Sequence, residues 1–404
     1  MTKADKFLNE VNSSYLKLHK KYEDLFWISY MGDRSVDAKK DKALSQLDTF
    51  RSDENLLEQA RALHKTAGDK LKLRLQYWIG FFEQHQLPDE AKPLREKIIA
   101  LETEISKKRS TRTTGYIDSV SGEFVLASEL KIQALIRTSS DEKIRKACFE
   151  AREKLALDLI EEYVVLVKLR NEFAWSLGFA DFYDYKLQKI DRMTKGELFS
   201  LFEDVTEKTK SMFSEIRKME QDIVGLRKPW NFSYYMTGDF TKEEDPYFQF
   251  DQSISRWGRS FSALGIDFKQ GKLQLDLLDR EGKHNNGFCH WPDLVHFDGG
   301  KRQSGSSNFT CNVVVGQVGS GVLGYNTLFH EGGHAAHFLN CEQKDVCLNH
   351  EYAPMTAGWA ETQSMFIDTL FSSIEWKTRY AEDSNGKYYP FELFERKVKK
   401  LNIL

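Results

Sequence analysis

Apolar residues recur at steps of three and four along most of the chain, the spacing that places them on one face of a helix. The pattern is clearest over residues 7–30, where Phe7, Val11 and Tyr15 belong to the apolar stripe. A second stretch of this kind covers residues 88–111. Both are predicted to be amphipathic helices whose apolar stripes are buried in a core.

The helical pattern is interrupted between residues 114 and 127. Glycines and β-branched residues alternate there with polar ones, so a loop or small hairpin is predicted. Helical spacing then resumes. Thr194 and Glu197 have the spacing of a capping box, which predicts that a long helix begins there and runs to about residue 224.

The pattern changes again near Gly265, where alternating residues indicate strands. Residues 273–278, 287–297 and 308–315 are predicted to be three strands of a small sheet, directly before another helix. An edge strand at this place could bind an extended peptide by strand addition. Alternatively, the sheet only supports the helix that follows, and the sequence leaves both interpretations open.

Composition supports a mainly α protein. The chain has 404 residues, 41% hydrophobic and 29% charged, with only 7 prolines. This is enough for one large or two ordinary domains. Because strands begin near Gly265, we expect a helical region over residues 1–264 and a second region, with the small sheet, over residues 265–404.

Charge and cysteine content argue against several classes of protein. Lys and Arg number 58 against 61 Asp and Glu, a net charge of −3, so neither nucleic acid nor an anionic membrane is an expected partner. No apolar stretch has the length of a membrane span or of a signal-peptide core. The five cysteines follow no paired spacing, which indicates free thiols in a reducing compartment. The expected location is the cytoplasm.

The strongest chemical signal is the sequence His330-Glu331-Gly332-Gly333-His334. On a helix, His330 and His334 lie on one face and can bind one Zn²⁺ together. Glu331 is one position further round, where its carboxylate can reach a metal-bound water. This is the arrangement of a zinc hydrolase.

A catalytic zinc site needs a third protein ligand. The metzincin pattern would place glycine three residues and histidine six residues after His334. Here His337 and Asn340 occupy those positions, so that class is excluded. His337 is interpreted as a packed histidine or as one that supports the ligands.

Glu361 is the favoured third ligand. It lies 27 residues after His334, in a stretch that is predicted to open a second helix. A helix, a connecting loop and a second helix can bring such a carboxylate back to the metal. Glu342 and Glu351 compete, but they lie in a connector rich in Cys, Asn and Pro, where their geometry would be poorly fixed.

These residues resemble a known family. The motif over residues 330–337, followed by Glu-Thr-Gln-Ser at 361–364, is similar to the thimet oligopeptidase family of zinc metallopeptidases. That family includes neurolysin and dipeptidyl carboxypeptidase and, more distantly, oligoendopeptidase F. Residues 275–283, 308–310 and 169–185 resemble further segments of it. The resemblance covers most of the chain from about residue 90 onward.

The resemblance implies a two-lobed helical body with the metal at the bottom of a deep channel that admits short peptides. The expected function is hydrolysis of short peptides by a zinc-activated water, with Glu331 as general base and His330, His334 and Glu361 as zinc ligands. Two alternatives are a zinc-binding helical protein or enzyme fragment that binds peptides or a partner without efficient catalysis, and a structural scaffold without zinc.

Two features depart from the family pattern. Gly332 stands where relatives carry a bulkier apolar residue, and we expect close packing against the sheet to be the reason. The segment with Gly-Tyr and Tyr-Tyr motifs, which binds substrate in the family, is not found after Glu361. We therefore expect a fragment, one half of a split enzyme, or a truncated relative, whose partner could be a missing C-terminal segment or a second chain.

Overall fold

The predicted sheet is present and organises one side of the molecule. The computed structural model describes residues 2–351 and 355–401. Strands β3 (Lys272–Leu278), β7 (Ser306–Val313) and β4 (Phe288–Asp293) form a sheet in that order. Because β7 pairs with β3 in parallel and with β4 antiparallel, β3 and β4 are the edges.

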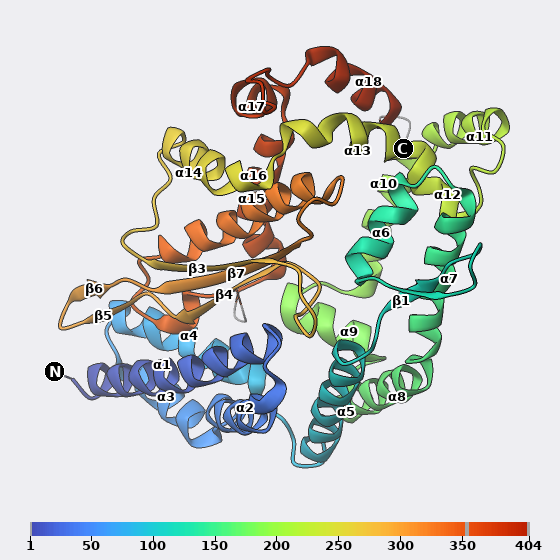
Figure 1. The fold of residues 1–404 in the computed structure, drawn as a ribbon. Coiled ribbons are helices and arrows are strands. Elements are labelled where there is room, and N and C mark those ends of the chain that lie inside the picture. The colour runs from blue at the N-terminus through green and yellow to red at the C-terminus, as the bar shows by residue number, and fades with distance from the viewer. Residues whose placement is uncertain (1, 352–354, 402–404) are drawn as a thin grey trace.

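Helices from distant parts of the chain cover the two sides of this sheet (Figure 1). α1 packs along β4 on one side, and α15 packs across β7 and β4 on the other. The helices of these two layers are α1 (Lys3–Tyr30), α2 (Asp37–Arg51), α3 (Glu54–Thr66), α4 (Asp69–His85), α14 (Ser253–Ala263), α15 (Ser320–Leu339) and α16 (Ala357–Ser372).

A second group of helices lies beside the sheet and forms the right-hand part of Figure 1. It contains one small hairpin, in which β1 (Gly115–Ile117) pairs antiparallel with β2 (Phe124–Leu126). Its helices are α5 (Lys92–Ser110), α6 (Glu129–Thr138), α7 (Glu142–Leu157), α8 (Ile160–Ser176), α9 (Phe182–Lys186), the π-helical turn η2 (Leu187–Asp191), α10 (Lys195–Thr209), α11 (Met212–Asp222) and α12 (Pro229–Ser233).

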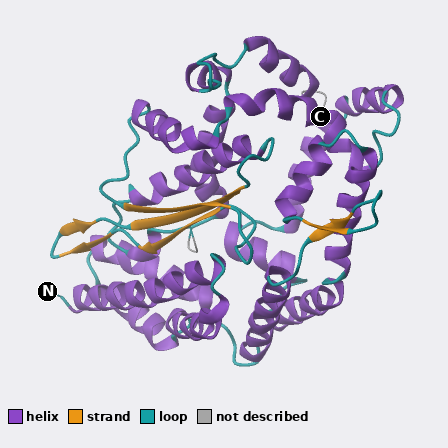
Figure 2. Ribbon diagram, in the orientation of Figure 1, coloured by secondary structure: helices purple, strands orange, loops and turns teal. Residues whose placement is uncertain are grey.

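The remaining helices lie along the top of Figure 1. They are α13 (Asp239–Glu244), α17 (Ile374–Tyr380) and α18 (Phe391–Leu401). A second hairpin, β5 (His296–Asp298) with β6 (Lys301–Gln303), extends from the sheet. Helices dominate the fold (Figure 2), which confirms the mainly α class with a small sheet beside the motif helix. In the described part of the chain, no helix is both long and apolar enough to cross a membrane.

Several local predictions are confirmed. The stretch at 7–30 lies within α1, which begins at a capping box made by Thr2 and Asp5. The stretch at 88–111 contains α5, and the hairpin between residues 114 and 127 is β1–β2.

Two predicted elements are divided. The helix that starts at the Thr194–Glu197 capping box ends at Thr209, and α11 follows after a turn. The Thr209 hydroxyl donates to the Val205 carbonyl (2.9 Å), a local hydrogen bond that bends helices. Likewise, residues 287–297 form β4 and the start of β5 instead of one strand: the β4–β7 register shifts between His290 and Asp293, and the pairing with β7 stops at Asp293.

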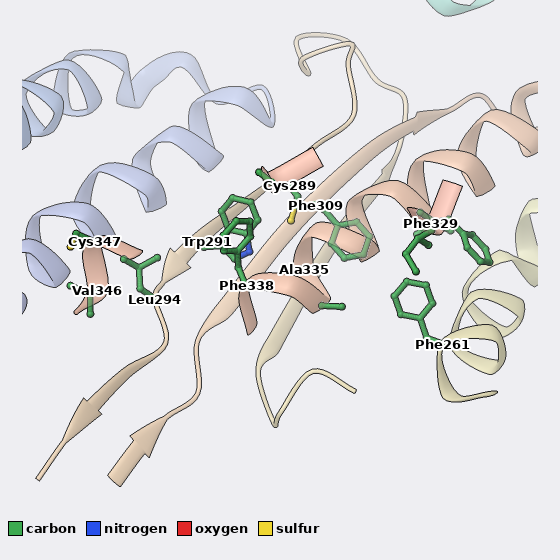
Figure 3. Packing of buried hydrophobic residues seen from close by; sticks show 14 of the residues in the cluster. Phe261, Cys289, Trp291, Leu294, Phe309, Phe329, Ala335, Phe338, Val346 and Cys347 are labelled. Atoms are coloured by element: carbon green, nitrogen blue, oxygen red, sulfur yellow. The ribbon is translucent and has the colours of Figure 1, made fainter. Parts of the chain in front are cut away.

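The main core joins the sheet to helices on both of its sides. Figure 3 shows Trp291 of β4 against Phe338 of α15, with ring centroids 4.5 Å apart. Near the middle of α15, Phe329 meets Phe261 of α14, with ring centroids 5.9 Å apart. The buried residues of this core come from the ranges 4–82 and 240–393, and the division at residue 264 stays a prediction.

Close packing explains the two glycines of the motif, but the partners are helices rather than the sheet. A Cβ on Gly332 would lie 2.6 Å from Nε1 of Trp257 in α14. A Cβ on Gly333 would lie 2.9 Å from the Cα of Ser364 in α16. Our expectation of packing against the sheet was therefore wrong: the glycines allow α14 and α16 to approach α15 from its other sides.

Candidate metal centre

Helix α15 carries both histidines of the motif. His330 and His334 are one turn apart, and their ring centroids are separated by 5.0 Å. His334 is buried, whereas the side chain of His330 is 26% exposed. The two imidazoles therefore share one face of the helix, as their spacing predicts, with one of them open to the surroundings.

Helix α16 brings a carboxylate to both imidazoles. Oε2 of Glu361 lies 3.4 Å from Nε2 of His330 and 3.4 Å from Nε2 of His334. The Ser364 hydroxyl donates to the same oxygen at 2.8 Å and so fixes the carboxylate. The contact depends on the close approach of α16 to α15 at Gly333.

The spacing of these atoms fits a zinc ion. Ligand atoms bound at about 2.0–2.1 Å in a tetrahedron lie about 3.3 Å from one another. The ligand atoms of His330, His334 and Glu361 all lie within 4.8 Å of one another, and two of the three separations are 3.4 Å. Among the described residues, no other set of three His, Cys, Asp or Glu side chains converges in this way.

Asp368 orients one of the imidazoles. Nδ1 of His330 lies 2.9 Å from Oδ2 of Asp368. This hydrogen bond, the largest influence on the group, raises the pKa of His330. With the Nδ1 proton donated to Asp368, Nε2 carries the lone pair and faces Glu361. Carboxylates commonly fix metal-binding histidines in this manner.

Asp368 was missed in the sequence, although a signal was present. It lies seven residues after Glu361, two helical turns along α16, so both carboxylates project from one face of that helix. Once Glu361 is suspected as a ligand, Asp368 can be expected to face the same site.

Glu331 lies next to this group without belonging to it. Its side chain is only 6% exposed, and burial raises its pKa to about 8. A Cβ on Gly287, just before β4, would lie 3.5 Å from its Oε1, so the chain passes close to the carboxyl group. A carboxyl group that titrates near neutral pH can both accept and donate a proton, and a cation bound beside it would lower this pKa again.

The other candidates lie outside the group. His337 stacks on Phe338, with ring centroids 4.4 Å apart, and is half-buried. Glu342 is exposed. Glu351 is half-buried, and its pKa is raised to about 7, first by burial and then by Glu361. It shares a cavity with Glu361 but is not among the converging ligand atoms.

Glu361 is the member of the group that lines a cavity of about 610 Å³. Glu361 and Ala360 of α16 line it together with Glu23 of α1 and with residues of α2, α4, α5, α9 and η2. Aromatic side chains of α1 and α9 contribute to its walls: Tyr22, Phe26, Tyr30 and Tyr185. The wall therefore contains helices from the α1 side of the sheet, helices from the second group, and α16.

Comparison with known proteins places this geometry in a family. Residues 135–403, more than half of the chain, match the model of peptidase family M3. The chain belongs to that family. Residues 1–224 also match a second peptidase family model, described as angiotensin-converting enzyme. A comparison with curated proteins finds no significant match.

Solved structures share the fold of this M3 family member. An oligoendopeptidase F, described as putative, from Bacillus anthracis str. Ames matches with a TM-score of 0.57 at 16% identity, over 93% of this chain and 73% of that one. Another structure with the same description matches with a TM-score of 0.61 at 14% identity, over 98% and 71%. PZ peptidase A with an inhibitor matches at 0.58 and 14% identity, over the same shares of the two chains.

Proposed function

We propose that the protein is a zinc metallopeptidase that hydrolyses peptide bonds in short peptides. His330, His334 and Glu361 are the proposed zinc ligands, and Glu331 is the proposed general base. One observation carries the proposal: a single carboxylate oxygen of Glu361 lies 3.4 Å from Nε2 of both histidines. In a family of peptidases, this convergence beside a buried glutamate supports metal-assisted hydrolysis.

The protonation states of the side chains suit a metal site. Burial lowers the pKa of His334 to about 4, so this imidazole is neutral and its lone pair is available. Asp368 holds the proton of His330 on Nδ1, away from Nε2. When bound, zinc supplies Lewis-acid polarisation of the scissile carbonyl and of the attacking water.

Glu331 moves the proton. It accepts a proton from the attacking water and returns it to the amine that leaves. Its burial keeps competing bulk water away, and a cation bound beside it would lower its pKa and so favour the proton-accepting form. The neighbouring positions 330 and 331 thus have separate tasks, one holding the metal and the other transferring the proton.

The cavity favours extended peptides as substrates. Its walls come from six helices and the turn η2, with Glu361 at one side. The cavity offers room for a short extended peptide beside Glu361, whose side chain is 46% exposed. The five cysteines are free, and four of them are buried, which suits a reducing compartment such as the cytoplasm; fractionation of cells would test this location.

The test is cleavage of a short quenched fluorescent peptide by the zinc-loaded protein. We expect turnover that a chelator removes and zinc restores. Glu331→Gln should bind zinc normally and lose about 10²–10⁴-fold in kcat, since general base catalysis contributes that much. Glu342→Gln, an exposed glutamate outside the group, is the matched control and should retain full activity.

Two results would contradict the proposal. Full activity of Glu331→Gln would remove its role as the base. Stoichiometric zinc without any turnover of a peptide panel by the wild-type chain would favour the alternative, a zinc-binding helical protein that captures peptides without cutting them. Circular dichroism of each variant controls for misfolding.

A further inference from the structure

The wall of the cavity that contains Glu361 carries three cations without a partner. They are Arg95 of α5, Lys186 of α9 and Lys189 of η2. Within residues 2–351 and 355–401, none of them has a carboxylate within 4.0 Å or forms a side-chain hydrogen bond. Arg51, in the same wall, is paired with Asp48 at 3.2 Å.

The three cations repel other positive charge at this place. The pKa of His85, which lines the same cavity, is lowered to about 4, first by burial and then by Arg51, Lys189 and Arg95. Burial, followed by Arg95, also lowers the pKa of Lys186. Glu102 and Asp191 act in the opposite direction on Lys186, but no described carboxylate lies within ion-pair distance of the three cations, so a carboxylate bound among them would gain charge-assisted hydrogen bonds.

This basic cluster lies close to the proposed zinc ligands. η2, which carries Lys189, contacts α16, which carries Glu361. Arg95 and Lys186 also line the adjoining cavity of about 570 Å³, so the cluster stands where the two cavities meet. An extended peptide advances about 3.3–3.6 Å per residue, so a chain held at Glu361 can reach the cluster within a few residues.

We propose that Arg95, Lys186 and Lys189 form a subsite that binds a carboxylate of the peptide substrate. The inference rests on the proposed peptidase function and specifies its substrate class: peptides with a negative charge a few residues from the bond to be cut. The carboxylate can come from the C-terminus of the peptide or from an Asp or Glu side chain. Arginine and lysine bind both through charge-assisted hydrogen bonds.

Ordinary solvated surface lysines would not share these features. Lys97 provides the contrast on the same helix α5: it is exposed, lines neither cavity and projects from another face of the helix than Arg95. Arg95 and Lys189 are half-buried within the cavity wall, whereas Lys186 is exposed and differs from Lys97 in lining both cavities. Three cations from three elements line one space next to the proposed metal site without an ion pair of their own, and a bound carboxylate would supply that partner.

The test is equilibrium binding of a fluorescein-labelled hexapeptide to the zinc-loaded Glu331→Gln protein, followed by anisotropy. Three versions of the peptide separate the sources of the carboxylate: a free C-terminus, a C-terminal amide, and a C-terminal amide with an internal Glu. We expect amidation of the neutral peptide to weaken binding about 10–100-fold, because a charge-assisted hydrogen bond is lost. The internal Glu should restore binding if side-chain carboxylates are accepted and leave it weak if only the C-terminus is read.

Variants then assign the effect to the cluster. In the Glu331→Gln background, Arg95→Gln with Lys189→Gln should bind the free and amidated peptides equally, and Arg95→Glu should prefer the amide. Lys97→Gln should keep the full preference. A double-mutant cycle between amidation and the Arg95 substitution measures the coupling directly.

Failure of this inference can be told apart from failure of the proposed function. Equal binding of all three peptides, no detectable binding of any, or an equal loss in Lys97→Gln would overturn the carboxylate subsite. Cleavage by the wild-type chain without a preference for carboxylates would overturn the subsite and leave the peptidase function intact. Preferential binding without cleavage would support the subsite and overturn the peptidase function.

Discussion

Helices α15 and α10 show how differently two helices of one chain are stabilised. α10 has a capping box at its start and no glycine after its first turn, yet none of its residues is buried. α15 follows Gly319, an N-cap residue in the left-handed region that gives no side-chain cap, and contains four glycines, yet thirteen of its twenty residues are buried. Its glycines alone cost about 4 kcal/mol relative to alanine.

The comparison indicates where the protein is rigid. Local signals determine α10, whereas tertiary contacts with α14, α16 and the sheet determine α15. A metal centre needs ligands that are fixed in place, and the surrounding core provides this at His330 and His334. α10 exposes large apolar residues, including Phe199 (48%) and Phe202 (49%), and belongs to the part where local opening is expected to be easiest.

The largest expected effect concerns stability. Phe338→Ala removes a buried ring of α15 that packs on Trp291, and we expect it to lower the free energy of unfolding by about 3–5 kcal/mol. Phe202→Ala on α10 is the matched control and should cost about 0.5 kcal/mol or less, because the ring is half exposed. Urea denaturation measures both. Equal losses would break the contrast between the two helices.

A smaller effect is expected at the metal centre. Asp368→Asn keeps the shape of the side chain and removes the charge that holds the His330 proton on Nδ1. We expect zinc affinity to fall about 10–100-fold, or about 1.4–2.8 kcal/mol. Competition with a chelating dye measures the affinity. Asp204→Asn, the same change on α10, should leave it unchanged; if it does not, the effect of Asp368 is not local.

Acid is expected to destabilise the buried packing of α1 more than it destabilises α10. His19 and His350 are buried with stacked rings 5.6 Å apart, and burial lowers the pKa of both below that of the unfolded chain. Below about pH 6.5, the unfolded state binds protons that the folded state does not, so stability falls by up to about 1.4 kcal/mol per pH unit for each histidine. The carboxylates of α10 are exposed and should contribute little.

This pH dependence can be measured by urea denaturation at pH 7.5 and pH 5.5. His350→Gln can keep a hydrogen bond to Tyr15, whose hydroxyl lies 2.8 Å from Nε2 of His350, and cannot be protonated. The variant should therefore lose less stability on acidification than the wild type. An identical loss in both proteins would show that these buried histidines do not titrate on unfolding.

The features that could be predicted from the sequence are those set by local signals, and the features set by tertiary contacts could not. The capping box of α10, the stripe of α1 and the pair His330–His334 depend on neighbours within a few residues, and these were predicted. Glu361 could be selected because a helix, loop and helix return the chain to its start. The position of a break that depends on local hydroxyl bonding, such as that after Thr209, has no strong signal in composition.

Features formed by segments that are far apart in the sequence could not be predicted. The partners of Gly332 and Gly333 lie on α14 and α16, and the sequence does not show which neighbour needs the space. The basic cluster joins Arg95 to Lys186 across about ninety residues, and nothing in either segment marks the pairing. Sequence patterns therefore identified the chemistry of the site, and the fold was needed to show what surrounds it.

The most direct measurement is anomalous diffraction from crystals of the zinc-loaded protein at the zinc edge. The proposed function predicts one strong peak within about 2.0–2.2 Å of Nε2 of His330, Nε2 of His334 and Oε2 of Glu361. The peak should vanish in Glu361→Ala crystals soaked at the same zinc concentration. No peak at this position in the wild-type crystals, or an undiminished peak in Glu361→Ala, would contradict the assignment of the metal centre.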